Sequence, residues 1–114
     1  MKELNGKKYI GFFRGMLYSL SDDNNDTMSE FDEYLNYKNE LSKQEIIIYL
    51  NNADIGYSPM YTYDIITGKQ LDNAGLIFDD ESVLPLDFIY YLEKYNIGVP
   101  IEYEEHIKNK ISNE

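Results

Sequence analysis

The sequence contains no cysteine and only one histidine, and its 10 basic side chains are outnumbered by 21 acidic ones. Without cysteine the chain can form neither a disulfide framework nor a thiolate metal site, and it has no cysteine nucleophile. This composition fits a reducing compartment. A single histidine also excludes a metal cluster built from several histidines.

Long hydrophobic runs are missing as well. Residues 1–9 are polar and bear lysines, no stretch of signal-peptide length follows them, and no later run approaches membrane-spanning length. We therefore expect a cytoplasmic protein that has no contact with a membrane. The 114 residues, 43% of them hydrophobic, are enough for one modest core, so residues 1–114 are expected to form a single domain.

The formal net charge of −11 is distributed unevenly, because residues 1–14 are net positive and the rest carries an even larger negative excess. Such a chain repels nucleic acid, and no basic stripe accompanies its tyrosines. The charge instead favours a basic protein partner. The alternative, that the charge only maintains solubility, stays open, and the sequence does not indicate an oligomeric state.

The N-terminal part contains an apolar, aromatic-rich run over residues 8–20 that is interrupted by Gly11 and Gly15. Glycine is unfavourable inside a helix and aromatic residues favour sheets. This pattern predicts a strand over residues 9–13, and a helix reaching Leu20 is the competing interpretation.

Two capping boxes, each a Ser or Thr followed three residues later by Glu, precede apolar residues at helical spacing. They predict helices over residues 28–37 and 43–52, capped at Thr27 and Ser42.

The middle of the chain has the pattern of a β-hairpin. Residues 60–66 are rich in aromatic and β-branched side chains, and residues 74–78 provide a returning strand. Gly68 between them can adopt the positive φ of a tight turn. After an acidic turn at residues 79–81, a short strand is possible at residues 82–84.

Two further helices are predicted near the C-terminus, over residues 85–96 after Pro85 and over residues 101–111 after Pro100. The expected fold class is therefore α+β. A small antiparallel sheet, made of the hairpin at about 60–78 and the N-terminal strand, should be packed by about four helices.

Oxygen-bearing side chains match five positions of an EF-hand-like calcium loop, at offsets 1, 3, 5, 9 and 12: Asp22, Asn24, Asp26, Glu30 and Glu33. However, Thr27 occupies the offset that usually requires glycine, and Ser29 replaces the usual aliphatic residue. A solvated acidic loop that leads into a capped helix is the favoured interpretation. Calcium binding stays an alternative, and no cofactor is expected.

No arrangement of side chains indicates catalysis. His106 lies on a predicted helix among charged residues, where an exposed histidine is expected. Asp79 and Asp80 could act as an acid–base pair, but they adjoin Glu81 in a turn, where carboxylates are usually solvated. No glycine-rich phosphate loop is present, so we expect no catalytic residues and no enzymatic activity.

Twelve tyrosines are unusual in a chain of this length. Tyrosine is common at protein interfaces, where it provides a large rigid contact surface with a polar tip. Several of them cluster at the following positions: Tyr57, Tyr61, Tyr63, Tyr90, Tyr91 and Tyr95. A compositional bias of an AT-rich genome is the alternative explanation. Tyr90 and Tyr91 point to adjacent faces of one helix, so at least one of them should be partly exposed.

Residues 42–107 resemble a group of small bacterial proteins, some of which look like immunity proteins of polymorphic-toxin or contact-dependent systems. The resemblance is carried by the helical segment KQEIIIYLNNA and by six short elements that follow it: Ser58-Pro59, Asp64, Thr67-Gly68, Asp79-Asp80, Tyr90-Tyr91 and Pro100. It implies a non-enzymatic binding protein and supplies no functional residues.

Charge and resemblance together lead to one hypothesis: an immunity or inhibitor protein whose acidic surface blocks the basic cleft of a toxin such as a nuclease. The expected partner-binding residues are Asp79, Asp80, Glu81, Tyr57, Tyr61 and Tyr90. One alternative is a phage or mobile-element inhibitor of a host defence enzyme that mimics a polyanion through a stripe of acids. A calcium-binding module using residues 22–33 is another.

Overall fold

The computed structural model describes residues 2–16, 18 and 28–113 and confirms the α+β fold class. In this part of the chain a five-stranded sheet has the strand order β1-β2-β5-β4-β3. The strands are β1 (Lys2–Leu4), β2 (Lys7–Tyr9), β3 (Asp54–Tyr63), β4 (Gln70–Asp79) and β5 (Ser82–Pro85). The helices are α1 (Phe31–Leu35), α2 (Lys43–Asn51), α3 (Phe88–Lys94) and α4 (Ile101–Ser112).

The N-terminal strand differs from the prediction in position and in direction. It is β2, at residues 7–9 rather than 9–13, and it pairs with β5 in parallel, so the sheet is mixed and not antiparallel throughout. The cause is a tight turn at Asn5-Gly6, where both residues have positive φ. An Asn-Gly turn of this kind joins β1 and β2 into an antiparallel hairpin.

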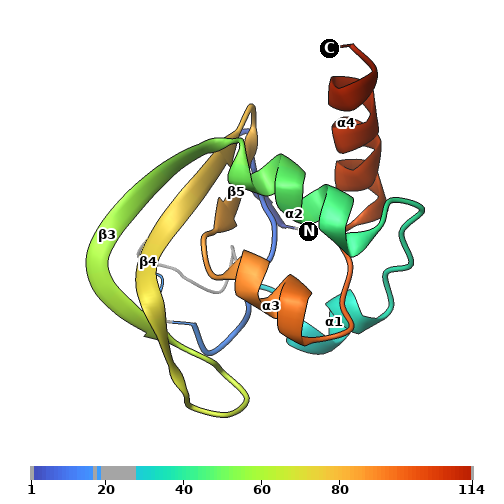
Figure 1. Ribbon diagram of the computed structural model, residues 1–114. Helices are drawn as coiled ribbons and strands as arrows, with labels where there is room; N and C mark the ends of the chain where they lie inside the picture. Colours follow the sequence, from blue (N-terminus) through green and yellow to red (C-terminus); the bar gives the residue numbers. More distant parts are fainter. Residues whose placement is uncertain (1, 17, 19–27, 114) are drawn as a thin grey trace.

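The β3–β4 hairpin is longer than predicted, because β3 begins at Asp54 and runs through Pro59. Proline is tolerated there since β3 is an edge strand and needs no amide bond on its outer side. The pairing register shifts on both sides of Tyr61, and such irregularities bend a strand. Figure 1 shows the result, a strongly curved hairpin. The turn prediction is confirmed, with Gly68 at a φ of 77°.

Helices α2 and α4 agree with the sequence prediction. The Ser42 capping box is present: the Ser42 hydroxyl accepts a bond from the Glu45 amide at 3.1 Å, and the Glu45 carboxylate accepts one from the Ser42 amide at 3.0 Å. Helix α4 follows directly after Pro100. None of the helices in the described ranges combines the length and the apolar character needed to cross a membrane.

Helices α1 and α3 both begin later than predicted. Helix α1 begins at Phe31 and not at residue 28, because Ser29 forms a β-bridge with Phe13. Its expected cap at residue 27 lies outside the described residues. Helix α3 begins at Phe88, because Pro85 is still part of β5 and pairs with Leu76. Competing strand contacts therefore shorten both helices at their N-terminal ends.

The hydrophobic core lies between the sheet and the helices, and α2 and α3 occupy the concave side of the curved hairpin (Figure 1). The ring of Phe13 is at the centre of an aromatic cluster, 5.0 Å from Tyr34 and 5.5 Å from Tyr91 between ring centroids. The sheet contributes Ile77 and Leu84 to the same core. This packing fixes α3 beneath the hairpin and so determines the space between them.

Candidate functional site

Within the described ranges four acidic side chains are buried, each residue at most 9% exposed: Asp64, Asp79, Asp87 and Glu104. Tyrosine hydroxyl groups donate hydrogen bonds to three of them, two to Asp64, two to Asp79 and one to Asp87. Five tyrosines thus hold internal carboxylates: Tyr18, Tyr49, Tyr90, Tyr95 and Tyr103. The abundance of tyrosine and of acid is therefore partly structural.

The predicted acidic turn is not a uniformly solvated group. Asp79 is buried, and its Oδ2 accepts hydrogen bonds from the hydroxyls of Tyr49 and Tyr103, each at 2.8 Å. Asp80 is half-exposed and pairs with Lys110 at 2.8 Å. His106, expected to be exposed, lies with its Nε2 3.2 Å from Asp79 and 3.6 Å from Asp80, and its ring stacks on Tyr103. These contacts attach α4 to the β4–β5 turn.

Among the described residues, the group with the spacing of metal ligands consists of Asp79, Asp80 and His106. Their donor atoms lie within 4.8 Å of one another. The oxygen of Asp79 that faces His106, however, already accepts two tyrosine hydroxyls, and the corresponding oxygen of Asp80 bonds the Lys110 ammonium group. A metal ion would have to break these bonds. We therefore interpret the cluster as a structural network of charges.

The predicted calcium loop can be followed only in part. Asp22, Asn24 and Asp26 lie outside the described residues. Glu30 forms an ion pair with Arg14 at 2.6 Å, and Glu33 accepts the Tyr37 hydroxyl at 3.0 Å. The calcium hypothesis stays an untested prediction.

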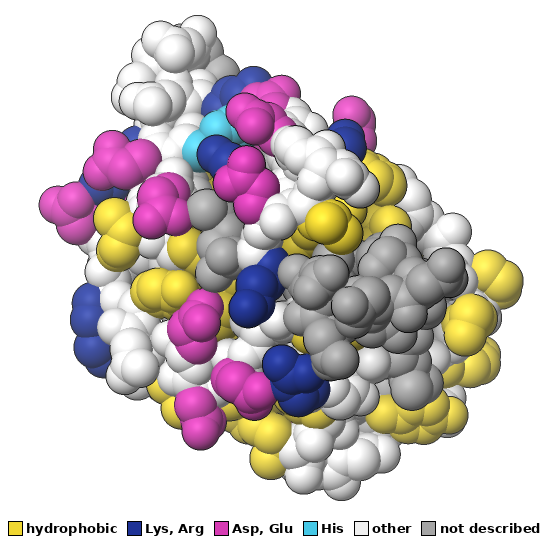
Figure 2. All heavy atoms as spheres, turned by 180° about the vertical axis from the view of Figure 1, so that it is seen from behind, with side chains coloured by type: hydrophobic (Ala, Val, Ile, Leu, Met, Phe, Trp, Pro, Cys, Tyr) yellow, Lys and Arg dark blue, Asp and Glu magenta, His cyan; other side chains and the backbone are white. Residues whose placement is uncertain are grey.

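The surface does not carry an unbroken acidic stripe on the face shown in Figure 2, where basic side chains are interspersed among the acidic ones. Hydrophobic side chains gather along the side formed by the β3–β4 hairpin (Figure 2). The most exposed of them come from β3 and the turn after it: Tyr57 at 74%, Met60 at 61%, Tyr61 at 55% and Ile66 at 54%. The hairpin therefore presents the main apolar surface on this side.

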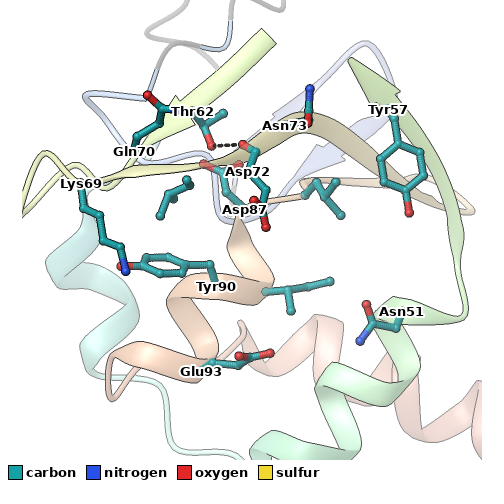
Figure 3. Close-up of a pocket in the computed structure, with 13 residues that line it drawn as sticks. Asn51, Tyr57, Thr62, Lys69, Gln70, Asp72, Asn73, Asp87, Tyr90 and Glu93 are labelled. Carbon is teal, nitrogen blue, oxygen red and sulfur yellow. Dashed lines mark hydrogen bonds between the residues drawn. The ribbon is translucent and has the colours of Figure 1, made fainter. Parts of the chain in front are cut away.

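A cavity of about 590 Å³ lies between the hairpin and α3. Figure 3 shows Tyr57 reaching toward it from β3 and Tyr90 from α3, with Glu93 across the cavity from Asp72 and Asp87. The volume falls within the range of small-molecule binding pockets. The curvature of the hairpin creates this space, because a flat sheet would pack directly on the helix.

Gly75 allows the two strands to approach closely next to the cavity. A Cβ atom at this position would lie 2.6 Å from the carbonyl oxygen of Gly56 on the neighbouring strand. Any side chain would therefore push β3 and β4 apart. The amide of Gly75 also donates a bond to the Tyr18 hydroxyl at 3.4 Å, which connects the hairpin to the group that holds Asp87.

The lining of the cavity is electronegative. Three carboxylates face one cation among the lining residues, namely Asp72, Asp87 and Glu93 against Lys69. Asp72 and Glu93 are exposed, and neither has an ion-pair partner within the described ranges. Carboxylates therefore outnumber the cation among the lining residues, which favours the entry of a positively charged group.

Asp87 is the buried member of this set, at 7% exposure. Its Oδ1 accepts the Tyr18 hydroxyl at 2.6 Å, whereas its Oδ2 is shielded from solvent and has no hydrogen-bond partner among the described residues. Burial raises the pKa of Asp87, and the bond from Tyr18 offsets only part of this effect. An unpartnered carboxylate oxygen of this kind calls for an explanation, such as an ordered water, an ion or a functional role.

The structure separates the predicted partner-binding residues into two groups. Tyr57 and Tyr90 line the cavity, and Tyr61 is exposed on the same hairpin. The turn at residues 79–81 lies at the other end of β4. Tyr61 pairs with Asn73, whereas Phe78, next to this turn, pairs with Asp54, which is roughly 20 Å from Tyr61 along β3. Glu81 is exposed in that turn.

The prediction about neighbouring tyrosines is confirmed, because Tyr91 is fully buried while Tyr90 is only partly so. The carboxylates of the cavity, in contrast, were missed. Glu93 lies one helical turn from Tyr90 and Ile89, and this spacing was a signal that it shares their face. For Asp72 and Asp87 no local pattern indicates that strand and helix bring them to one cavity.

Comparisons with known proteins do not identify a family. No family model matches the chain, and searches of curated proteins and of solved structures return no match. The resemblance to immunity-like proteins therefore stays a prediction, and the function has to be argued from the geometry of the cavity and the charge around it.

Proposed function

We propose that this protein is a non-enzymatic acidic binding protein that inhibits a basic macromolecule, as an immunity protein against a toxin such as a nuclease. The observation that carries the proposal is the electronegative cavity under the β3–β4 hairpin, where Asp72, Asp87 and Glu93 face a single lysine. A positively charged side chain of a partner would relieve this imbalance.

The surroundings of the cavity support a protein partner. Tyr57 is 74% exposed at the edge of the cavity, and Met60 and Tyr61 extend the apolar surface along β3. Interfaces typically combine a few exposed aromatic anchors with charged groups at their edge. The net charge of −11 would add long-range attraction and so accelerate association with a basic partner.

The polyanion-mimic alternative receives less support. Mimicry of a nucleic acid requires acids arranged in a continuous stripe, whereas the face in Figure 2 shows acids interspersed with lysines. We therefore place the contact at the hairpin and not on a broad acidic surface.

A growth assay tests the proposal. Cells would express the toxin encoded next to this protein's gene, together with the wild-type protein or with the double variant Asp72→Asn/Glu93→Gln. The matched control is Glu3→Gln/Glu105→Gln, which removes two exposed acids away from the cavity and changes the net charge equally. Binding of the purified toxin would be measured in parallel by interferometry.

We expect the wild type and the control to protect the cells, and the cavity variant to bind the toxin at least about tenfold more weakly. Protection that is equal for the cavity variant and the control would contradict the location of the contact. Growth that does not depend on this protein at all would contradict the inhibitory function.

A further inference from the structure

We infer that the cavity between the β3–β4 hairpin and α3 is a recognition site for an arginine side chain. That a basic partner supplies this arginine rests on the function proposed above; the chemistry of the site itself rests on Asp72, Asp87, Glu93 and the two tyrosines that flank them.

The lining carries more carboxylates than cations, and these carboxylates are only partly committed to other side chains. Asp72 and Glu93 have carboxylates without ion-pair partners among the described residues, and the Oδ2 of Asp87 has no hydrogen-bond partner there. Figure 3 shows these groups on opposite sides of the cavity. A matching ligand therefore has to be cationic and must offer several donors that point in different directions. The guanidinium group offers five N–H donors in one plane and accepts nothing.

Burial favours a guanidinium group over an ammonium group. Asp87 is 7% exposed, so a cation that pairs with it must leave most of its water behind. The guanidinium group is weakly hydrated and always charged, whereas the lysine ammonium group is compact and strongly hydrated. A fork of two N–H groups can also bond a carboxylate at both oxygens. The cavity should therefore discriminate between the two basic side chains.

The aromatic walls provide the second element of recognition. Tyr57 reaches toward the cavity from β3 and Tyr90 from α3 (Figure 3). Tyr90 is held in place because its hydroxyl donates to Asp64 at 2.7 Å. Lys94 already lies over the Tyr90 ring, 5.8 Å from its centroid, so the Tyr57 ring is the one on which a planar guanidinium group can stack while its edge bonds the carboxylates. The ligand would enter beside Tyr57 and turn the Asp87 carboxylate toward itself.

The test uses small probes, so it needs no partner protein. The full-length protein, labelled with ¹⁵N, would be titrated with N-acetyl-arginine amide, with the lysine analogue, and with N-acetyl-citrulline amide, which is neutral but nearly identical in shape to arginine. We expect saturable amide shifts for residues around the cavity with arginine, with a dissociation constant on the order of millimolar. Citrulline should cause none, and the lysine analogue should bind at least fivefold more weakly.

Variants connect the shifts to the site. Asp87→Asn keeps the shape of the side chain and should weaken arginine binding at least tenfold, whereas the control Glu3→Gln/Glu105→Gln should bind like the wild type. Thermal unfolding of each variant shows whether it is folded.

The inference and the proposed function can fail separately. Absence of shifts with arginine up to 50-fold excess over the expected constant, or equal binding of arginine and lysine analogues, overturns the arginine site while leaving protection against a toxin intact. Arginine binding that is unchanged in Asp87→Asn also overturns it. Arginine binding without protection from the toxin would instead retain the site and contradict the immunity function.

Discussion

Asp64 and Asp87 are both buried carboxylates beside α3, yet they differ in the number of hydrogen bonds that they accept. Each oxygen of Asp64 accepts two hydrogen bonds: the amides of Ile66 and Thr67 bond Oδ1, and the hydroxyls of Tyr90 and Tyr95 bond Oδ2. Burial alone would raise its pKa, but these four donors outweigh it and lower the pKa to about 2. Asp87 has one tyrosine donor, and its pKa is raised by burial.

The comparison shows that the number of donors, and not burial by itself, determines whether a buried acid stabilises the fold. Asp64 closes the hairpin turn and connects it to α3, and it has no unused bonding capacity. Asp87 keeps an unused oxygen next to a cavity. The first acid is a structural element, whereas the second has the properties expected of a binding group.

The largest expected effect is a difference in stability between variants in which Asp64 or Asp87 is truncated to alanine. Asp64→Ala leaves two amides and two tyrosine hydroxyls without their acceptor, and we expect it to lower the free energy of unfolding by about 3 kcal/mol or more. Asp87→Ala leaves only the Tyr18 hydroxyl without its acceptor, and it removes an unfavourable buried charge. We therefore expect it to lower the free energy of unfolding by about 1 kcal/mol or less. Urea unfolding at pH 7 measures both. Equal losses would remove the distinction drawn here.

Acid unfolding should reveal Asp64 in the wild type. Its folded pKa of about 2 lies below the ordinary value of 3.8, so the native state binds fewer protons, and stability falls as the pH drops through this window. The shift corresponds to about 2 kcal/mol. We expect the urea midpoint to fall between pH 4 and about 2 in the wild type and to change little in Asp64→Asn. Tyr95→Phe, which removes one donor, should give an intermediate curve.

The smallest expected effect concerns Asp87, whose contribution to stability depends on pH in the direction opposite to that of Asp64. Because the folded pKa of Asp87 is raised, its contribution to stability declines as the pH rises above the unfolded value. Asp87→Asn should therefore have a urea midpoint at pH 7 that is equal to or slightly above that of the wild type. The difference should vanish below about pH 4, where the side chain at this position is neutral in both proteins. A clear loss of stability at pH 7 would show that the ionised carboxylate is needed for folding.

Much of the fold follows from local patterns in the sequence. The Ser42 capping box, the Gly68 turn and the start of α4 after Pro100 each act within a few residues, and each prediction agrees with the structure. The errors arise where distant segments compete. Ser29 pairs with Phe13 instead of extending α1, and Pro85 completes β5 instead of opening α3. The Asn5-Gly6 turn was a local signal, but the interpretation overlooked it.

The site was harder to predict, because it depends on curvature. Tyr57, Tyr61 and Tyr90 were selected for their residue type, and the structure places all three on the hairpin or around its cavity. Asp79 and His106 are predicted to face solvent, yet they lie in a network between the β4–β5 turn and α4. Asp72, Asp87 and Glu93 come together only because the hairpin bends over α3, and no spacing in the sequence encodes that bend.

The parallel pairing of β2 with β5 has a consequence for how the chain acquires its shape during synthesis. Residues 8 and 82 are neighbours in the sheet, so the hairpin at the start of the chain emerges from the ribosome long before its partner strand exists. Until then Lys7, Lys8 and their neighbours have no sheet to join. The pairing of β2 with β5 should therefore be among the last events of folding.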